Sequence, residues 1–211
     1  MNKFLTLLAV VVVVGLVLFI DIPFLGTFVG VICALVFSWW QGGLHTLGFT
    51  TPKIGYLATV LIALGMAIVM LLATKFLLLP SIEAITKEPL QLGPFAGFKG
   101  NTPVYLFNVL IGWLMGGLLE EILFRGFLLS KIELLVSGRV GQVVGVVSTS
   151  AFFGYLHGYQ GVTGQILLGL VGIILGSFFI MNQRNIWLNI LLHGFINTGT
   201  FTLLYLGWWT A

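Results

Sequence analysis

The stretch LTLLAVVVVVGLVLFI, residues 5–20, contains no charged side chain. Its length approaches the roughly 20 apolar residues that a helix needs to cross a bilayer. Apolar runs of similar length recur at residues 22–40, 54–80, 104–124, 140–157, 162–181 and 186–208. The repetition predicts an all-α fold, a polytopic membrane helix bundle with about seven transmembrane helices.

The composition excludes a water-soluble globule, because 59% of the residues are hydrophobic and only 7% are charged, with a mean hydropathy of +1.14. The apolar runs are continuous rather than alternating, which argues against a lipid-facing β-barrel. The net charge of +3 comes from cations near the expected helix ends, so nucleic acid is not expected as a partner.

The first apolar run follows Lys3 and has the length of a signal peptide. No small-x-small cleavage pattern follows it before Asp21 and Pro23, so we interpret it as a retained helix. The single cysteine, Cys33, lies inside the second run, which excludes an internal disulfide.

Residues 1–211 are expected to form one transmembrane domain with three parts. Residues 1–80 supply the N-terminal helices, and residues 81–103 form a Pro- and Gly-containing extracytoplasmic loop. Residues 104–211 form the catalytic core, since the ionisable groups within apolar helices are concentrated there. Alternating loops put Lys3, Lys53, Lys131, Arg139 and Arg184 on one side and Lys87 and Lys99 on the other, which predicts a cytoplasmic N-terminus.

Four glycine pairs lie at a spacing of four within the predicted helices, at 26/30, 112/116, 141/145 and 172/176. This spacing exposes bare backbone on one helical face and favours close packing of helices. Packing within the bundle is the simpler interpretation, and a dimer motif is the alternative.

The sequence EEILFRG, residues 120–126, places two carboxylates and an arginine at the end of an apolar run. On an α-helix Glu121 and Arg125 share a face and can pair, whereas Glu120 is offset by about 100° from Glu121. An unpaired glutamate in hydrocarbon costs several kcal/mol, so Glu120 requires either water at the helix end or a functional cavity.

Two later helices add polar groups in pairs four residues apart. FFGYLHGYQG contains Phe153 and His157, and NIWLNILLHGFINTGT contains His193 and Asn197, with Asn189 on the same stripe as a candidate supporting group. A free carboxylate and an imidazole can activate water, and a second imidazole with an amide can stabilise the oxyanion formed at a carbonyl. The combination favours a hydrolase.

These three motifs, Glu-Glu-x-x-x-Arg, Phe-x-x-x-His and His-x-x-x-Asn, resemble those of the CAAX protease and bacteriocin-processing family, also called the Abi family, which includes type II CAAX prenyl endopeptidases. The resemblance is firm from about Val104 onward. It implies an intramembrane endopeptidase of a prokaryotic cell membrane, which needs no cofactor. Its partners would be membrane lipid and a protein or peptide substrate, prenylated or not.

By the same resemblance, Glu120 is the general base and His157 shares the activation of water. His193 and Asn197 stabilise the oxyanion, while Glu121, Arg125 and Phe153 support the site. Counting 1.5 Å per residue, Glu120 and His157 lie roughly 22–25 Å along their helices but His193 only about 10 Å. Tilted helices, or a helix starting near Gly145, would reconcile these depths.

Two alternatives remain open from the residues. In a zinc protease, Glu120, His157 and His193 would ligate the metal and leave a fourth position for water, although His-Glu-x-x-His spacing is absent. In a transporter or membrane scaffold, the buried charges would form a relay or lock the helices together, but the first three helices add little beyond Asp21, His45 and Lys75.

Overall fold

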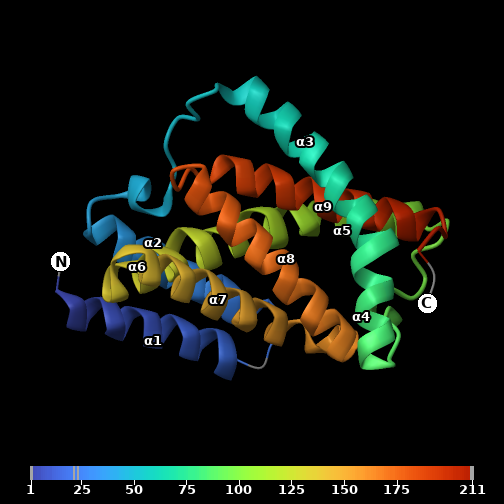
Figure 1. The fold of residues 1–211 in the computed structure, drawn as a ribbon, viewed down its shortest axis with the longest axis horizontal. Coiled ribbons are helices and arrows are strands. Elements are labelled where there is room, and N and C mark those ends of the chain that lie inside the picture. Colours follow the sequence, from blue (N-terminus) through green and yellow to red (C-terminus); the bar gives the residue numbers. More distant parts are fainter. Residues whose placement is uncertain (1, 21, 23, 210–211) are drawn as a thin grey trace.

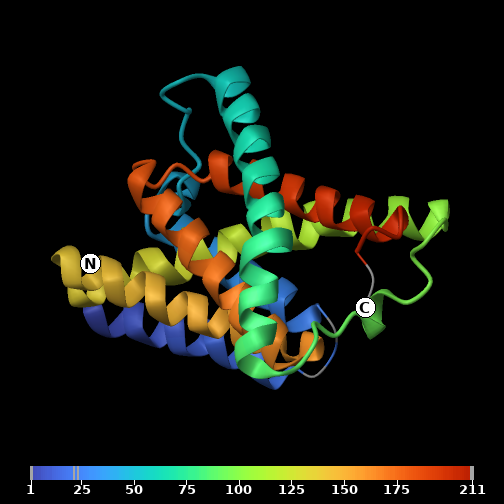
Figure 2. The same cartoon turned by 45° about the vertical axis from the view of Figure 1, so that its right-hand side comes forward.

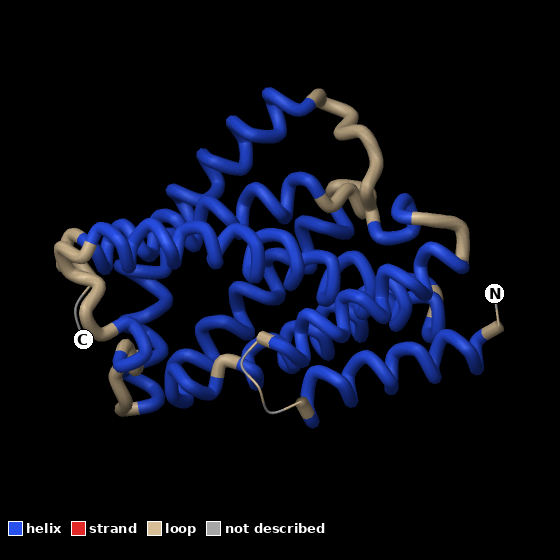
Figure 3. The backbone as a smooth tube through the Cα atoms, turned by 180° about the vertical axis from the view of Figure 1, so that it is seen from behind, coloured by secondary structure: helices blue, strands red, loops and turns tan. Residues whose placement is uncertain are grey.

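The computed structural model describes residues 2–20, 22 and 24–209, and this part of the chain is helical without any strand (Figures 1 and 3). Seven long helical segments follow one another, which confirms the predicted all-α membrane bundle. Asp21 and Pro23, considered above, lie outside the described residues.

Short bends and turns separate the seven segments. They are α1 (Lys3–Phe19), α2 (Leu25–Trp40), α3 (Tyr56–Ala73) with α4 (Leu79–Thr86), α5 (Thr102–Ile111) with α6 (Ser130–Val136), α7 (Gly138–Leu156), α8 (Gly161–Met181) and α9 (Trp187–Tyr205). π-Helical turns join α3 to α4 at Thr74–Leu78 and α5 to α6 at Gly112–Glu120 and Ile122–Leu129. Single 3₁₀ turns lie at Leu44–Leu47, Gly93–Phe95 and Gly158–Gln160.

Two helical segments, Tyr56–Thr86 and Thr102–Val136, extend beyond the ends of the apolar runs predicted at residues 54–80 and 104–124. The third continues past Pro80 to Thr86, because the proline falls in the first turn of α4, where its missing N–H is least needed, directly after a π-helical turn. The interval expected to be a loop from Ser81 therefore begins at Lys87. By length and composition, Tyr56–Thr86, Thr102–Val136 and Gly158–Met181 are each able to cross a membrane.

The segment from α5 to α6 runs through the centre of the bundle. All eight residues of its second π-helical stretch, Ile122–Leu129, are buried. They pack against α1, α2, α7 and α8 in the main apolar cluster, which includes Val13, Val31, Val146 and Phe179. In Figure 1, α8 runs obliquely between α7 and α9, and Figure 2 shows α9 alongside α5.

The glycine pairs pack within the chain. An added Cβ would meet the backbone of α1 at Gly26, Asn197 of α9 at Gly112 and Gly116, the backbone of Glu133 at Gly141, and Ser150 of α7 at Gly172. Each pair thus lets two helices of the same chain approach closely. The packing interpretation is confirmed at these positions.

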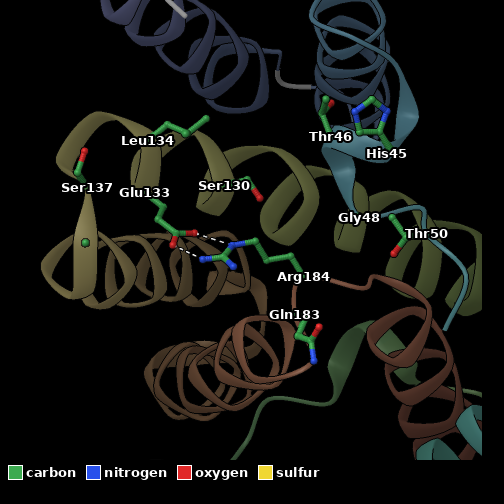
Figure 4. A pocket seen from close by; sticks show the side chains of 11 residues that line it. His45, Thr46, Gly48, Thr50, Ser130, Glu133, Leu134, Ser137, Gln183 and Arg184 are labelled. Carbon is green, nitrogen blue, oxygen red and sulfur yellow. Dashed lines mark hydrogen bonds and ion pairs between the residues drawn. The ribbon is translucent and has the colours of Figure 1, made fainter. Parts of the chain in front are cut away.

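A polar pocket of about 550 Å³ lies at the end of the bundle that carries the α2–α3 loop and the α8–α9 turn. Figure 4 shows Arg184 reaching across it to Glu133. This hydrogen-bonded pair raises the pKa of the Arg184 guanidinium. Asn185 holds the two loops together by donating to the Thr50 carbonyl (2.6 Å), and Ile186 N–H donates to the Gly48 carbonyl (3.0 Å). The loops at this end are therefore fixed to each other.

Candidate active site

Glu121 is buried at the centre of a group of hydrogen-bonded polar side chains. Arg125 Nη1 and His193 Nδ1 lie 2.9 Å and 2.7 Å from its Oε1, and Asn189 Nδ2 donates to its Oε2 at 3.3 Å. The Glu121 and Arg125 side chains are 0% and 2% exposed. The predicted ion pair is confirmed, and Asn189 contacts it as anticipated for a supporting group.

Arg125 is held on several sides as well. Besides Glu121, its guanidinium donates to the Gly172 carbonyl at 3.3 Å and lies 5.1 Å from the centre of the Phe153 ring. A buried ion pair is tolerated when further hydrogen bonds satisfy both partners, and removing one partner is then strongly destabilising. The pair therefore fixes the positions of three helices, because Arg125, Gly172 and Phe153 come from different ones.

Glu120 has a different environment from its neighbour. Its side chain is 19% exposed, and its Oε2 lies 3.9 Å from His193 Nε2, beyond hydrogen-bond distance. No hydrogen bond to the Glu120 carboxylate is found among the described residues. One carboxylate is thus fully paired and the other faces open space, as the helical offset predicted.

His157 ends α7 and is held by its own helix. Its Nδ1 lies 2.7 Å from the Phe153 carbonyl oxygen, which can only accept, so Nδ1 carries the proton. The ring packs 4.6 Å from the Phe153 ring, which in turn contacts the His193 ring at 6.1 Å. Nε2 of neutral His157 therefore has its lone pair free to accept a hydrogen bond.

Asn197 lies one turn beyond His193 on α9 and against the π-helical segment. Its Nδ2 donates to the Gly112 carbonyl at 2.9 Å, which leaves the second amide proton free. The position is possible because Gly112 and Gly116 have no side chain, and a Cβ at Gly116 would overlap Asn197 Nδ2 and lie 3.3 Å from His193 Nε2. The glycine pair shapes the site.

A single cavity of about 220 Å³ is lined by all four side chains predicted to be catalytic, Glu120, His157, His193 and Asn197, together with Phe153. The expected disagreement in depth does not occur. α7 starts at Gly138 rather than near Gly145, so the difference is absorbed by the oblique courses of the helices (Figure 1). The farther part of the cavity is mostly apolar and includes Leu90, Phe95 and Trp209.

Some lining residues were not singled out from the sequence. Tyr159 lines the cavity, lies with its ring centre 5.6 Å from that of His157 in a tilted arrangement, and accepts a hydrogen bond from Gln160. Asn108 and Thr200 line the apolar part. Tyr159 lies within the quoted FFGYLHGYQG stretch, but nothing in its spacing indicates a site. His45 and Lys75 lie elsewhere: His45 lines the polar pocket, and Lys75 donates to the Trp208 carbonyl at 2.9 Å.

The zinc alternative needs Glu120, His157 and His193 gathered around one point. Within the described ranges, no group of three or more His, Cys, Asp or Glu side chains is arranged to hold a metal ion. His193 directs Nδ1 toward Glu121, an arrangement that metal-ligating histidines also show while Nε2 binds the metal. The three predicted ligands are not gathered around one point in the described structure, and the zinc alternative stays a prediction.

Comparison with known proteins agrees with the motif geometry. Residues 102–199 match the family model described as Type II CAAX prenyl endopeptidase Rce1-like. No curated protein and no solved structure matches the chain. The matched segment contains all three motifs, and the fold brings a side chain from each of them to one cavity. Residues 102–199, a little under half of the chain, therefore support assignment of this protein to the CAAX protease family.

Proposed function

We propose that this protein is an endopeptidase that cleaves a membrane-associated protein or peptide with water activated by Glu120 and His157. The observation that carries the proposal is the contrast between the two adjacent glutamates. Glu121 is saturated by Arg125, His193 and Asn189, while Glu120 faces the cavity without a hydrogen-bond partner among the described residues. A carboxylate in that position is available to accept a proton.

The activation of water would be shared. Glu120 would accept the proton, and the free Nε2 lone pair of His157 would accept a hydrogen bond from the same water and orient it. The tautomer of His157 supports this role, because Nδ1–H is committed to the Phe153 carbonyl. The hydroxide so generated would attack the carbonyl carbon of the scissile peptide bond.

The oxyanion would be stabilised from α9. The second amide proton of Asn197 is free to donate to it. His193 can donate only through Nε2, since Nδ1 faces Glu121, so this role requires the imidazolium form. The Glu121 carboxylate accepts the hydrogen bond from Nδ1, which leaves Nε2 as the ring atom that lines the cavity. His193 can then pass a proton to the leaving amine.

The substrate would be anchored in the membrane. The cavity combines the polar groups at one end with apolar side chains such as Leu92, Phe201 and Leu204 along its remaining length. Such a lining accommodates apolar side chains or a lipid group, including a prenyl chain, next to the scissile bond. We place the protein in the cell membrane of a prokaryote and assign it no cofactor.

The test compares native membrane proteins after incubation with wild type or with the Glu120→Ala variant, using mass spectrometry of new peptide termini. Glu88→Ala is the matched control, because Glu88 is an exposed acid outside the cavity. Termini that appear with wild type and Glu88→Ala but not with Glu120→Ala support the proposal. Identical termini in all three samples contradict it.

A further inference from the structure

The active-site cavity continues past the proposed oxyanion donors, between the segment that begins with α5 and helix α9. These two segments run antiparallel. A Cβ at Gly112 would lie 3.2 Å from Asn197 Cβ, and Tyr105 Oη, earlier on α5, lies 3.1 Å from Thr202 Oγ1, later on α9. The residues between these two contacts therefore lie opposite one another on the two segments.

Asn108 and Thr200 lie in this stretch, and both line the cavity. Asn108 Nδ2 donates to the Val104 carbonyl at 2.8 Å, whereas its Oδ1 accepts no hydrogen bond from the described residues. Thr198 and Thr202 donate their hydroxyls to the carbonyls four residues back on α9, at 2.9 Å and 2.7 Å. The Thr200 hydroxyl makes no such bond with the described residues. An amide oxygen and a hydroxyl are therefore free to bind a ligand.

The surroundings of these two groups are mostly apolar, with Ile196, Phe201 and Leu204 also lining the cavity. A peptide group that enters apolar surroundings gives up its hydrogen bonds to water, which is costly unless the protein replaces them. Binding sites accordingly place a few polar groups among apolar ones to fix the orientation of a ligand. Asn108 Oδ1 can accept from a backbone N–H, and the Thr200 hydroxyl can donate to a backbone carbonyl.

The two groups are close to the proposed oxyanion donor. Thr200 follows Asn197 by three residues, which is about 4.5 Å along the helix axis. An extended peptide advances about 3.3 Å per residue, so the backbone groups within reach are one or two residues from the scissile bond. We propose that Asn108 and Thr200 form a subsite that hydrogen-bonds the substrate backbone at this distance and holds it extended. This subsite rests on the proposed endopeptidase function.

The test uses a synthetic peptide that spans a cleavage site mapped by mass spectrometry of new termini. In matched peptides, one amide near the scissile bond at a time is replaced by an ester, which lacks the N–H. Asn108→Leu and Thr200→Val keep the size of the side chain and remove its polar atoms. Thr200→Ser retains the hydroxyl, and Thr202→Val is the control, because it removes an α9 hydroxyl that does not line the cavity.

Asn108→Leu and Thr200→Val should each raise KM by about three- to tenfold with little change in kcat, as expected for the loss of one hydrogen bond between uncharged groups. Thr200→Ser and Thr202→Val should keep the wild-type KM. An ester one or two residues from the scissile bond should raise KM for wild type but not for Asn108→Leu, in which the acceptor for that N–H is already missing.

Unchanged KM in both variants, a fall confined to kcat, or an equal effect of the ester on wild type and Asn108→Leu overturns the subsite. The unfolding midpoint in detergent shows which variants are folded, and the Thr200→Val and Thr200→Ser pair decides the outcome if Asn108→Leu is not. Cleavage that depends on Glu120 but shows none of these KM effects refutes the subsite alone. Absence of any cleavage by wild type refutes the proposed function and the subsite with it.

Discussion

Replacing Gly116 by alanine should inactivate the enzyme while leaving it folded. The added Cβ would overlap Asn197 Nδ2 and lie 3.3 Å from His193 Nε2, so it meets the two proposed oxyanion donors at once. Restoring an ordinary contact of 3.4 Å requires Asn197 to move by about 1 Å, which also breaks its hydrogen bond to the Gly112 carbonyl. A displacement of about 1 Å at a catalytic group can cost roughly a hundredfold in rate.

The expected loss is therefore about 2.7 kcal/mol of transition-state stabilisation, seen as a hundredfold fall in kcat/KM. Stability should change less, because the overlap costs about 1–3 kcal/mol and alanine in a helix recovers about 0.5–1 kcal/mol relative to glycine. The cleavage rate and the thermal unfolding midpoint in detergent measure the two effects separately.

Gly65→Ala provides the matched control. Gly65 lies in the middle of α3, and a Cβ there would meet nothing within 4 Å. This variant should keep full activity. Its only expected change is the small gain in stability that alanine provides over glycine in a helix. If Gly116→Ala cleaves substrate as fast as Gly65→Ala, the placement of Asn197 and His193 in the reaction is wrong.

Four further outcomes are expected. Glu120→Gln keeps the shape of the side chain but removes its basicity, so cleavage should slow by at least about two orders of magnitude, and an undiminished rate would exclude Glu120 as the base. Asn197→Ala should lower kcat by roughly a hundredfold with little change in KM, and a change confined to KM would indicate substrate binding instead. Arg125→Ala leaves Glu121 without its cation and should destabilise the protein by about 3–5 kcal/mol in a detergent unfolding assay. Unchanged stability with abolished turnover would make Arg125 a direct participant. A membrane-permeant chelator should leave activity intact, whereas stoichiometric zinc in the purified protein, with reversible loss on chelation, would support the metal mechanism.

The membrane class and the helix count were predictable because both depend on short-range properties of the chain. Continuous apolar runs such as residues 5–20 specify helices wherever the solvent is lipid, since every backbone polar group must be satisfied within its segment. The helix ends were less predictable. The third helix continues to Thr86 because Pro80 falls at a first turn, and only the three-dimensional structure places a π-helical turn before it.

The residues of the site were also predictable to a large extent. The spacing of four in Glu121–Arg125 fixes their pairing, and the motif order identifies His157, His193 and Asn197. Their convergence was not predictable, because counting residues along straight helices placed Glu120 and His193 at different depths. Oblique crossing of the helices, allowed by glycines such as Gly112 and Gly116, brings them together.

The sequence by itself therefore determined that the protein resides in a membrane, which segments are helical, and which polar side chains are available for catalysis. These properties follow from composition and from contacts within one or two helical turns. Tertiary structure alone decided which glutamate is hydrogen-bonded on all sides, which nitrogen of His157 carries the proton, and which side chains line one cavity. Each of these depends on atoms from helices distant in sequence or on the exact end of a helix. The carboxylate of Glu121 is hydrogen-bonded because Asn189 and His193 of α9 contact it across the bundle. Glu120 makes no such hydrogen bond among the described residues, and its nearest approach to His193 Nε2 is 3.9 Å.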